Sequence, residues 1–240
     1  MEDLNKNYVN KVLALKMCLS MLDIKLENVT EKYKGDLFNE SNISKFNIFN
    51  LLLKDLTFSE KFKKYSEHKC GSLKRFKDRR TGLQYAIDLI LGWIAEDAVL
   101  LFLRKKNRQV ILSGEDRCRE FLNAKKISTQ ADIIIKSNSG KRKIELINDW
   151  SNTWENKNHL DLRENKYLAL KSERAIVLGI SPTIQKALLI DLYNDGGSWT
   201  RIEKHFPYGG KPAWQLSNPR GMLKDLNIVM ENLNQILKYE

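Results

Sequence analysis

The sequence predicts a mixed α/β fold, with a central β-sheet of about five strands, mixed in direction and flanked by helices. Three observations lead to this prediction. An apolar segment of helical length spans 81–106, short apolar runs of strand length follow it, and two of those runs are far enough apart for a helix between them. A helix that joins two parallel strands packs on a face of the sheet, so we expect one mixed α/β domain.

The first part of the chain is predicted to be helical. An apolar stripe at roughly helical spacing favours a helix over 2–34, and a second apolar run favours another over 43–56. We assign residues 1–60 to an N-terminal helical layer. The segment 81–106 is predicted to be one long buried helix, interrupted by three acids: Asp88, Glu96 and Asp97. Each acid would be costly in hydrocarbon, so we expect no contact with a membrane.

The strands are predicted from five short apolar runs over 109–112, 131–136, 143–150, 175–180 and 187–192. Gly140 supplies the positive φ that a hairpin turn needs between the second and third runs. A polar loop carrying Trp154 is expected over 151–159, and a helix over about 160–173. We assign residues 61–195 to the core of the domain.

The amino-acid composition changes after Tyr193, where glycine, proline and tryptophan become frequent. Ser198 is a candidate N-cap for a helix over 199–205. A helix-turn-helix over 198–226 is an open alternative. An amphipathic helix is predicted over 223–239 and closes the chain.

The chain is strongly basic, with a formal net charge of +11. A surplus of this size favours a polyanionic partner, and we expect nucleic acid rather than a merely basic host proteome. The densest basic cluster lies over 61–80, and its candidate DNA-contacting residues are Lys74, Arg75, Lys77, Arg79 and Arg80. Long cations interleaved with aromatic residues suit phosphate contacts. A solvated helix face is the alternative for this cluster.

The C-terminal stretch is a second candidate DNA contact, and we assign 196–240 to a DNA-contacting subregion. Loops rich in glycine, tryptophan and basic residues can enter a groove, where Arg and Lys read guanine edges. The candidates are Arg201, Lys204, Lys211 and Arg220. The alternative is a lid that Trp199 and Trp214 pack against the core.

Cys18, Cys70 and Cys118 are far apart and form no CxxC pair, so a structural zinc site is not expected. Their odd number and wide spacing indicate reduced thiols and a cytoplasmic location. The N-terminal residues are acidic and polar, unlike a signal peptide.

Two acids at the ends of neighbouring predicted strands form the candidate chemical centre. Asp132 opens the second run and Glu145 lies inside the third. Acids on paired strands hold a fixed separation, and hard cations such as Mg²⁺ prefer carboxylate oxygens. Asp132 and Glu145 therefore make a candidate divalent-metal site.

The order of these elements resembles the PD-(D/E)xK nuclease superfamily, and within it the type II restriction endonucleases. The family pattern is a helix, often with G-x-x-x-E, then a strand, a strand with Asp, a hairpin and a strand with (D/E)xK. Gly92 and Glu96 match the helix, and the paired acids match Asp132 and Glu145. The resemblance covers the middle of the chain. It implies a restriction-endonuclease-like core over 61–195, with Glu96 near the active centre; a surface pairing of Glu96 with nearby basic residues is the alternative.

One departure from the family pattern concerns its lysine, because Ile147 stands where the pattern has it. Migration of the lysine onto the next helix resembles some superfamily members and favours Lys166. Lys143, one same-face step before Glu145, is the second candidate. A third possibility is that the carboxylates suffice and no lysine serves.

The resemblance implies Mg²⁺-dependent hydrolysis of phosphodiester bonds in double-stranded DNA at a short specific sequence. It also implies a homodimer, since enzymes that cut both strands of a palindromic site usually work as symmetric dimers. Two alternatives stay open. One is another nuclease of the same fold, a junction resolvase or a repair nuclease that binds by DNA shape. The other is a non-catalytic sequence-specific DNA-binding protein, which Ile147 favours.

Overall fold

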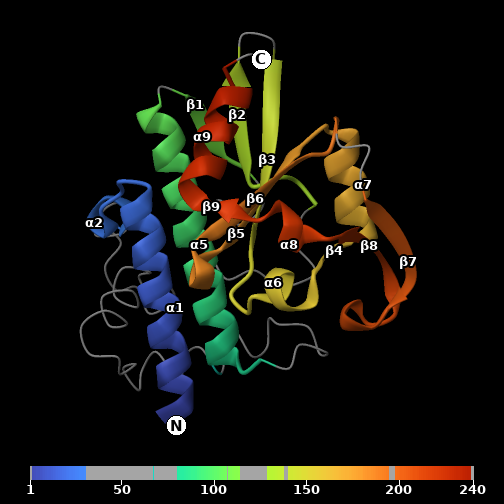
Figure 1. Cartoon of the computed structure of the whole chain (residues 1–240), viewed down its shortest axis with the longest axis horizontal. Coiled ribbons are helices and arrows are strands. Elements are labelled where there is room, and N and C mark those ends of the chain that lie inside the picture. The colour runs from blue at the N-terminus through green and yellow to red at the C-terminus, as the bar shows by residue number, and fades with distance from the viewer. Residues whose placement is uncertain are drawn as a thin grey trace. The chain divides into compact units, whose positions relative to one another are not determined.

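The structure is a computed structural model that describes residues 2–30, 67, 80–106, 108–113, 129–137, 140–194 and 198–238 (Figure 1). The chain divides into two compact units. Unit 1 comprises Met1–Leu101 with Cys118–Ile127, and unit 2 comprises Phe102–Arg117 with Ser128–Glu240. These borders fall elsewhere than the predicted ones after residues 60 and 195, which stay predictions.

The described part of unit 1 is helical, with α1 (Glu2–Met21), α2 (Leu26–Thr30) and most of α5 (Gly82–Lys105). The prediction of one helix over 2–34 is wrong, because Asp23 takes a left-handed conformation with φ 52° between α1 and α2. The ammonium of Lys11 donates to Asp88 Oδ1 at 2.9 Å and ties α1 to α5. Cys18 is buried in α1, and this burial raises the pKa of its thiol to about 12.

Helix α5 matches the predicted long buried helix over 81–106. Thr81 and Gln84 form a capping box at its start: the Gln84 N–H donates to Thr81 Oγ1 at 3.1 Å, and the Thr81 N–H donates to Gln84 Oε1 at 2.8 Å. The apolar residues between Ile87 and Leu103 are almost all buried. Its last turn, from Phe102, belongs to unit 2. Among the described residues, no helix has both the length and the apolar character that a membrane span requires.

Unit 2 contains a six-stranded mixed sheet in the order β1-β2-β3-β5-β6-β9. Its strands are β1 (Gln109–Leu112), β2 (Ile133–Ser137), β3 (Gly140–Asn148), β5 (Ile176–Ser181), β6 (Lys186–Asp191) and β9 (Lys224–Asp225). The β3–β5 pair is parallel and the other pairs are antiparallel. The predicted mixed sheet with flanking helices is therefore confirmed, with one strand more than expected. All six residues of β5 are buried, as a central parallel strand requires.

A second, three-stranded antiparallel sheet was not predicted. Its strands are β4 (His159–Arg163), β8 (Lys211–Ser217) and β7 (Trp199–His205), in the order β4-β8-β7. The remaining helical elements are α6 (Thr153–Lys157), α7 (Glu164–Ser172), η3 (Pro182–Ile184), η4 (Phe206–Tyr208), α8 (Pro219–Met222) and α9 (Leu226–Ile236). Elements α6, β4 and α7 together form the crossover from β3 to β5. In Figure 1, the β7–β8 hairpin lies beyond α7 on the outer side of unit 2.

The crossover elements cover one face of the central sheet. Val177 of β5 and Ile190 of β6 pack in one buried cluster with Tyr167 and Leu170 of α7. Trp154 of α6 belongs to the same cluster and fits over Gly179 of β5, where a Cβ atom would lie only 2.7 Å from its ring. This close approach requires glycine on β5 and sets how near α6 comes to the sheet.

Three sequence predictions in unit 2 are wrong. The helix over about 160–173 is strand β4 followed by helix α7, and the helix over 199–205 is strand β7. The loop over 151–159 contains helix α6, whose Trp154 is buried. The helix-turn-helix over 198–226 is excluded, because strands β7 and β8 occupy most of that segment. The helix predicted over 223–239 is present as α9.

Candidate active site

Asp132 and Glu145 lie at the same end of the β2–β3 ladder. Ile133, the first residue of β2, pairs with Ile144; Asp132 comes directly before Ile133, and Glu145 directly after Ile144. Asp132 Oδ2 accepts the backbone N–H of Leu146 at 2.8 Å, which ties the first acid to the residue beside the second. The two predicted acids therefore lie at one end of the β2–β3 hairpin, with Asp132 held by the backbone of β3.

Lys166 of α7 reaches the same place from the crossover. Its ammonium lies 2.7 Å from Glu145 Oε2, as an ion pair between side chains that are 18% and 10% exposed. It also donates to the backbone carbonyl of Gln130 at 2.8 Å, two residues before Asp132. Lys166 of α7 thus contacts both Glu145 of β3 and the segment that leads into Asp132.

Lys143 is held elsewhere. Its ammonium lies 2.6 Å from Glu173 Oε1, at the end of α7. Ile147, at the position of the family lysine, is partly buried and packs against the apolar cluster of Trp154 and Tyr167. Of the two lysines proposed to replace the one missing at Ile147, the structure therefore brings Lys166 and not Lys143 into contact with Glu145.

Glu96 lies in the part of α5 that belongs to unit 1, outside the unit that carries the two strand acids. Its residue exposure is 8%, so it is not the surface acid of the alternative prediction. Arg104, one of the basic residues near Glu96 in the sequence, donates to the carbonyl of Val110 at 3.3 Å.

The donor set at Asp132 and Glu145 fits Mg²⁺. Proteins commonly bind this ion through one or two carboxylates, while water and substrate phosphates fill the remaining positions. Within the described ranges, no three His, Cys, Asp or Glu side chains are grouped so that they could hold a metal ion. The two acids would hold Mg²⁺ as an open site rather than as a closed cage of protein ligands.

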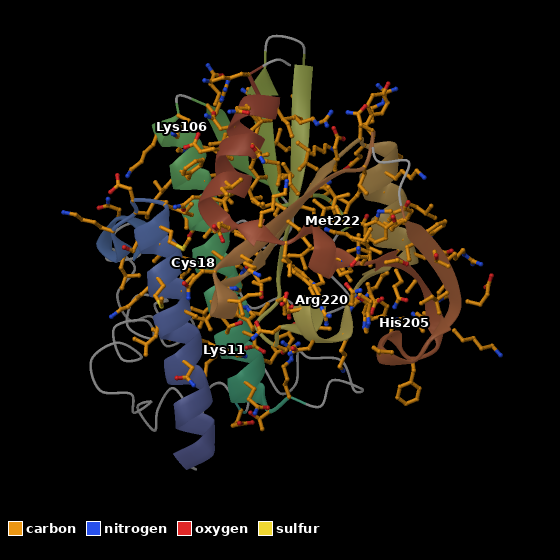
Figure 2. The ribbon with its side chains drawn as sticks, in the orientation of Figure 1. Lys11, Cys18, Lys106, His205, Arg220 and Met222 are labelled. Carbon is orange, nitrogen blue, oxygen red and sulfur yellow. The ribbon has the colours of Figure 1, made fainter. Side chains whose placement is uncertain are left out.

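The C-terminal candidates for DNA contact have different surroundings. The guanidinium of Arg201 lies 2.5 Å from Glu164 Oε1 and also bonds Glu203; the hydrogen bond to Glu164 raises the pKa of Arg201. Arg220 donates to the carbonyl oxygens of Glu155 and Asn156 at 2.5 and 3.3 Å, and Figure 2 shows it beside α6. Lys204 and Lys211 are exposed on strands β7 and β8.

The N-terminal basic cluster lies mostly outside the described residues. This holds for the predicted contacts Lys74, Arg75, Lys77 and Arg79. Arg80 is described, and its guanidinium bonds Asp88 Oδ2 at 3.0 Å and lies over the ring of Tyr85 at 4.9 Å. Arg80 is therefore engaged within unit 1.

The tryptophans that the lid alternative invoked do pack against the core. The ring of Tyr167 stacks on Trp214 with centroids 4.5 Å apart and meets Trp199 at 5.0 Å. Because Tyr167 follows Lys166 directly in α7, these contacts also fix the helix that presents Lys166.

The sequence did not reveal a polar hub around Asp161. Its carboxylate lies 3.0 Å from His205 Nε2 and 3.5 Å from His159 Nε2, and it accepts from Gln215 Nε2 at 2.8 Å. The hydroxyl of Tyr208 donates to the Asp161 carbonyl at 2.8 Å; burial, and after it the Asp161 charge, raises the pKa of Tyr208. These residues come from β4, β7, η4 and β8, so only the strand pairing assembles them.

Comparison with models of protein families, with curated proteins and with solved structures found no match to this chain.

Proposed function

We propose that this protein is a Mg²⁺-dependent endonuclease of the PD-(D/E)xK type that cuts double-stranded DNA at a short specific sequence. One observation carries the proposal: Lys166 is ion-paired to Glu145 at the end of the β2–β3 ladder where Asp132 is bonded to the backbone of Leu146. The net charge of +11 supports a polyanionic substrate.

Each residue has a distinct part in the proposed reaction. Asp132 and Glu145 hold Mg²⁺, which supplies Lewis-acid chemistry at a phosphate oxygen and lowers the pKa of water. Lys166 orients the attacking water or offsets the charge that builds up on the phosphate in the transition state. Water oxygen adds to phosphorus, one P–O bond to sugar breaks, and the leaving oxygen takes up a proton.

The feature that favours a non-catalytic DNA-binding protein is Ile147, since it is apolar and packs in the core cluster. Lys166 can supply the cation that is missing at Ile147, because its ammonium contacts Glu145 from helix α7. A cation delivered from a neighbouring element can act on the phosphate as one on the strand would.

The experiment is digestion of a plasmid with Mg²⁺ and, separately, with EDTA. We expect discrete fragments with Mg²⁺, none with EDTA, and none with Asp132→Ala or Glu145→Ala, while both variants still bind DNA. Glu173→Ala is the matched control, because Glu173 is an acid of the same unit that pairs with Lys143. It should cut like the wild type.

The remaining outcomes separate the alternatives. A smear without discrete fragments would indicate a nuclease that reads DNA shape, and binding without any cleavage would indicate a non-catalytic binder. Cleavage by either acid variant at the wild-type rate would refute the site. We also propose a homodimer, for which the expected result is linear DNA that forms without accumulation of nicked circles.

A further inference from the structure

The tip of the β7–β8 hairpin exposes a large apolar side chain. Phe206, the first residue of η4, is 84% exposed, whereas the other large exposed apolar residues of the described chain reach at most 54%. Single exposed apolar residues are common on proteins, so exposure alone assigns no role to Phe206.

Phe206 lies in the sequence between His205 and Tyr208, and contacts with Asp161 hold both of these residues in place. His205 is buried, with Nε2 3.0 Å from Asp161 Oδ2, and the hydroxyl of Tyr208 donates to the Asp161 carbonyl at 2.8 Å. The rings of His205 and Tyr208 contact each other with centroids 4.6 Å apart. Figure 2 labels His205 at the end of β7, where the strand turns. Phe206 is therefore presented by a braced turn.

The backbone of the turn keeps the tip narrow. Gly209 and Gly210 have φ of 73° and 80°, values that favour glycine, and the Gly210 N–H closes the turn on the His205 carbonyl at 3.0 Å. Pairing of β4 with β8 ends at Ala213, so the hairpin is two-stranded between that residue and the tip. A two-stranded ribbon is narrow enough to enter a DNA groove.

The charges beside the tip suit a polyanion. Lys204 precedes the turn and Lys211 follows it, and both are exposed. Glu203, the acid next to them, is bonded by Arg201. Two exposed cations therefore flank the exposed ring in the sequence, on a chain whose net charge is +11.

We propose that the β7–β8 hairpin enters a groove of double-stranded DNA and that Phe206 wedges between neighbouring base pairs, with Lys204 and Lys211 on the flanking phosphates. Apolar wedges between base steps unstack them and deform the duplex. The inference rests on the proposed function for its choice of DNA as the partner, but it requires no cleavage.

The test uses the full-length protein in EDTA, so that cleavage does not intervene. Affinity is measured on a fluorescent duplex. Deformation is measured on a closed circular plasmid relaxed by a topoisomerase that needs no Mg²⁺, because wedging changes the linking number of the relaxed product. The variants are Phe206→Ala and Phe206→Trp. The control is Ile228→Ala, which removes a 50% exposed apolar side chain from α9.

We expect the wild type, Phe206→Trp and Ile228→Ala to bind alike and to shift the linking number. Phe206→Ala should bind roughly 5- to 150-fold more weakly, the range expected for loss of one stacked aromatic ring. At saturating protein it should leave the linking number as in free plasmid.

Equal affinity and equal topology for Phe206→Ala and wild type would overturn the inference, as would a loss of self-association in size-exclusion chromatography without any effect on DNA. Failure of the wild type to bind DNA would also overturn it. A Phe206-dependent shift in a protein that never cuts with Mg²⁺ would sustain the hairpin role and refute the nuclease. If the wild type cuts DNA normally and Phe206→Ala changes neither affinity nor linking number, the nuclease proposal is sustained and the hairpin role is refuted.

Discussion

Glu145 is a buried acid at the centre of the proposed site. Its residue exposure is 8%, and removal of a charged carboxylate from water is costly unless the charge is paired. The ammonium of Lys166, 2.7 Å from Glu145 Oε2, offsets this cost. In the proposed reaction, Lys166 would also act on the phosphate.

The role of Lys166 gives the first prediction at this scale. Lys166→Ala should lower the cleavage rate about 100- to 1,000-fold, the loss typical for one group that stabilises transition-state charge. Lys143→Ala is the matched control, because Lys143 pairs with Glu173 and should leave the rate near that of wild type. The rate of supercoil loss under single-turnover conditions measures both.

A rescue variant makes this prediction sharper. Ile147 lies two residues after Glu145, so alternation along β3 puts both on one face. In the double variant Lys166→Ala, Ile147→Lys, the ammonium returns to the family position, and part of the lost rate should return with it. Ile147→Lys alone controls for damage to packing. If Lys166→Ala cuts normally, or Lys143→Ala is equally impaired, Lys166 has no special role.

Some residues of the site could be predicted and others could not, for a physical reason. The apolar runs and the hairpin glycine were enough to predict that Asp132 and Glu145 belong to the two arms of one local hairpin. Lys166 was chosen by resemblance. The partners Glu173 and Gln130 depend on where α7 lands on the sheet, which no local pattern encodes. The Asp161 hub depends on a strand pairing that was not foreseen.

At the scale of elements, continuous apolar runs predicted their structures well, and short amphipathic runs did not. Helix α5 and strand β5 are buried along most of their length, so each appears in the sequence as a continuous apolar run. Strand β4 has the alternating burial of a half-exposed strand, and its sequence HLDLR shows the same period of two. The prediction for this segment is nevertheless a helix. Strand β7 was assigned to a helix from its cap, and pairing with β8 overrides that local preference.

The fit of Trp154 over Gly179 gives a prediction about stability. Gly179→Ala would put a methyl group 2.7 Å from Trp154 Cη2 and 2.9 Å from Leu188 Cδ1, so we expect a loss of about 1–3 kcal/mol in the free energy of unfolding. Urea denaturation followed by circular dichroism measures this loss.

The clash can be tested by a second substitution. Trp154→Phe removes the ring atoms that meet the new methyl group, so the double variant should lose less than the sum of the single losses. Strict additivity would show that the two sites do not touch, and a Gly179→Ala protein as stable as wild type would contradict the packing.

At the scale of the whole molecule, the order of the apolar runs predicted the class of fold but not the division of the chain. Alternating apolar runs were enough for a mixed sheet with flanking helices. The second sheet and the two units arise from contacts between distant segments, such as β4 with β8. Net charge belongs to this scale too, because it acts through the summed field of many side chains.

That field gives the last prediction, which concerns the basic residues over 61–80. Each Lys or Arg that contacts a phosphate releases counterions and adds about 0.9 to the slope of log affinity against log salt. If Lys74, Arg75 and Lys77 contact the DNA backbone, the triple alanine variant should lower that slope by up to about 3 and weaken binding alike on all sequences.

Arg80→Ala is the control: its guanidinium is held by Asp88 at 3.0 Å, so its loss should leave the slope nearly unchanged. Binding to a short duplex at several salt concentrations, in EDTA, supplies the slopes. An unaltered slope in the triple variant would assign Lys74, Arg75 and Lys77 to a solvated surface.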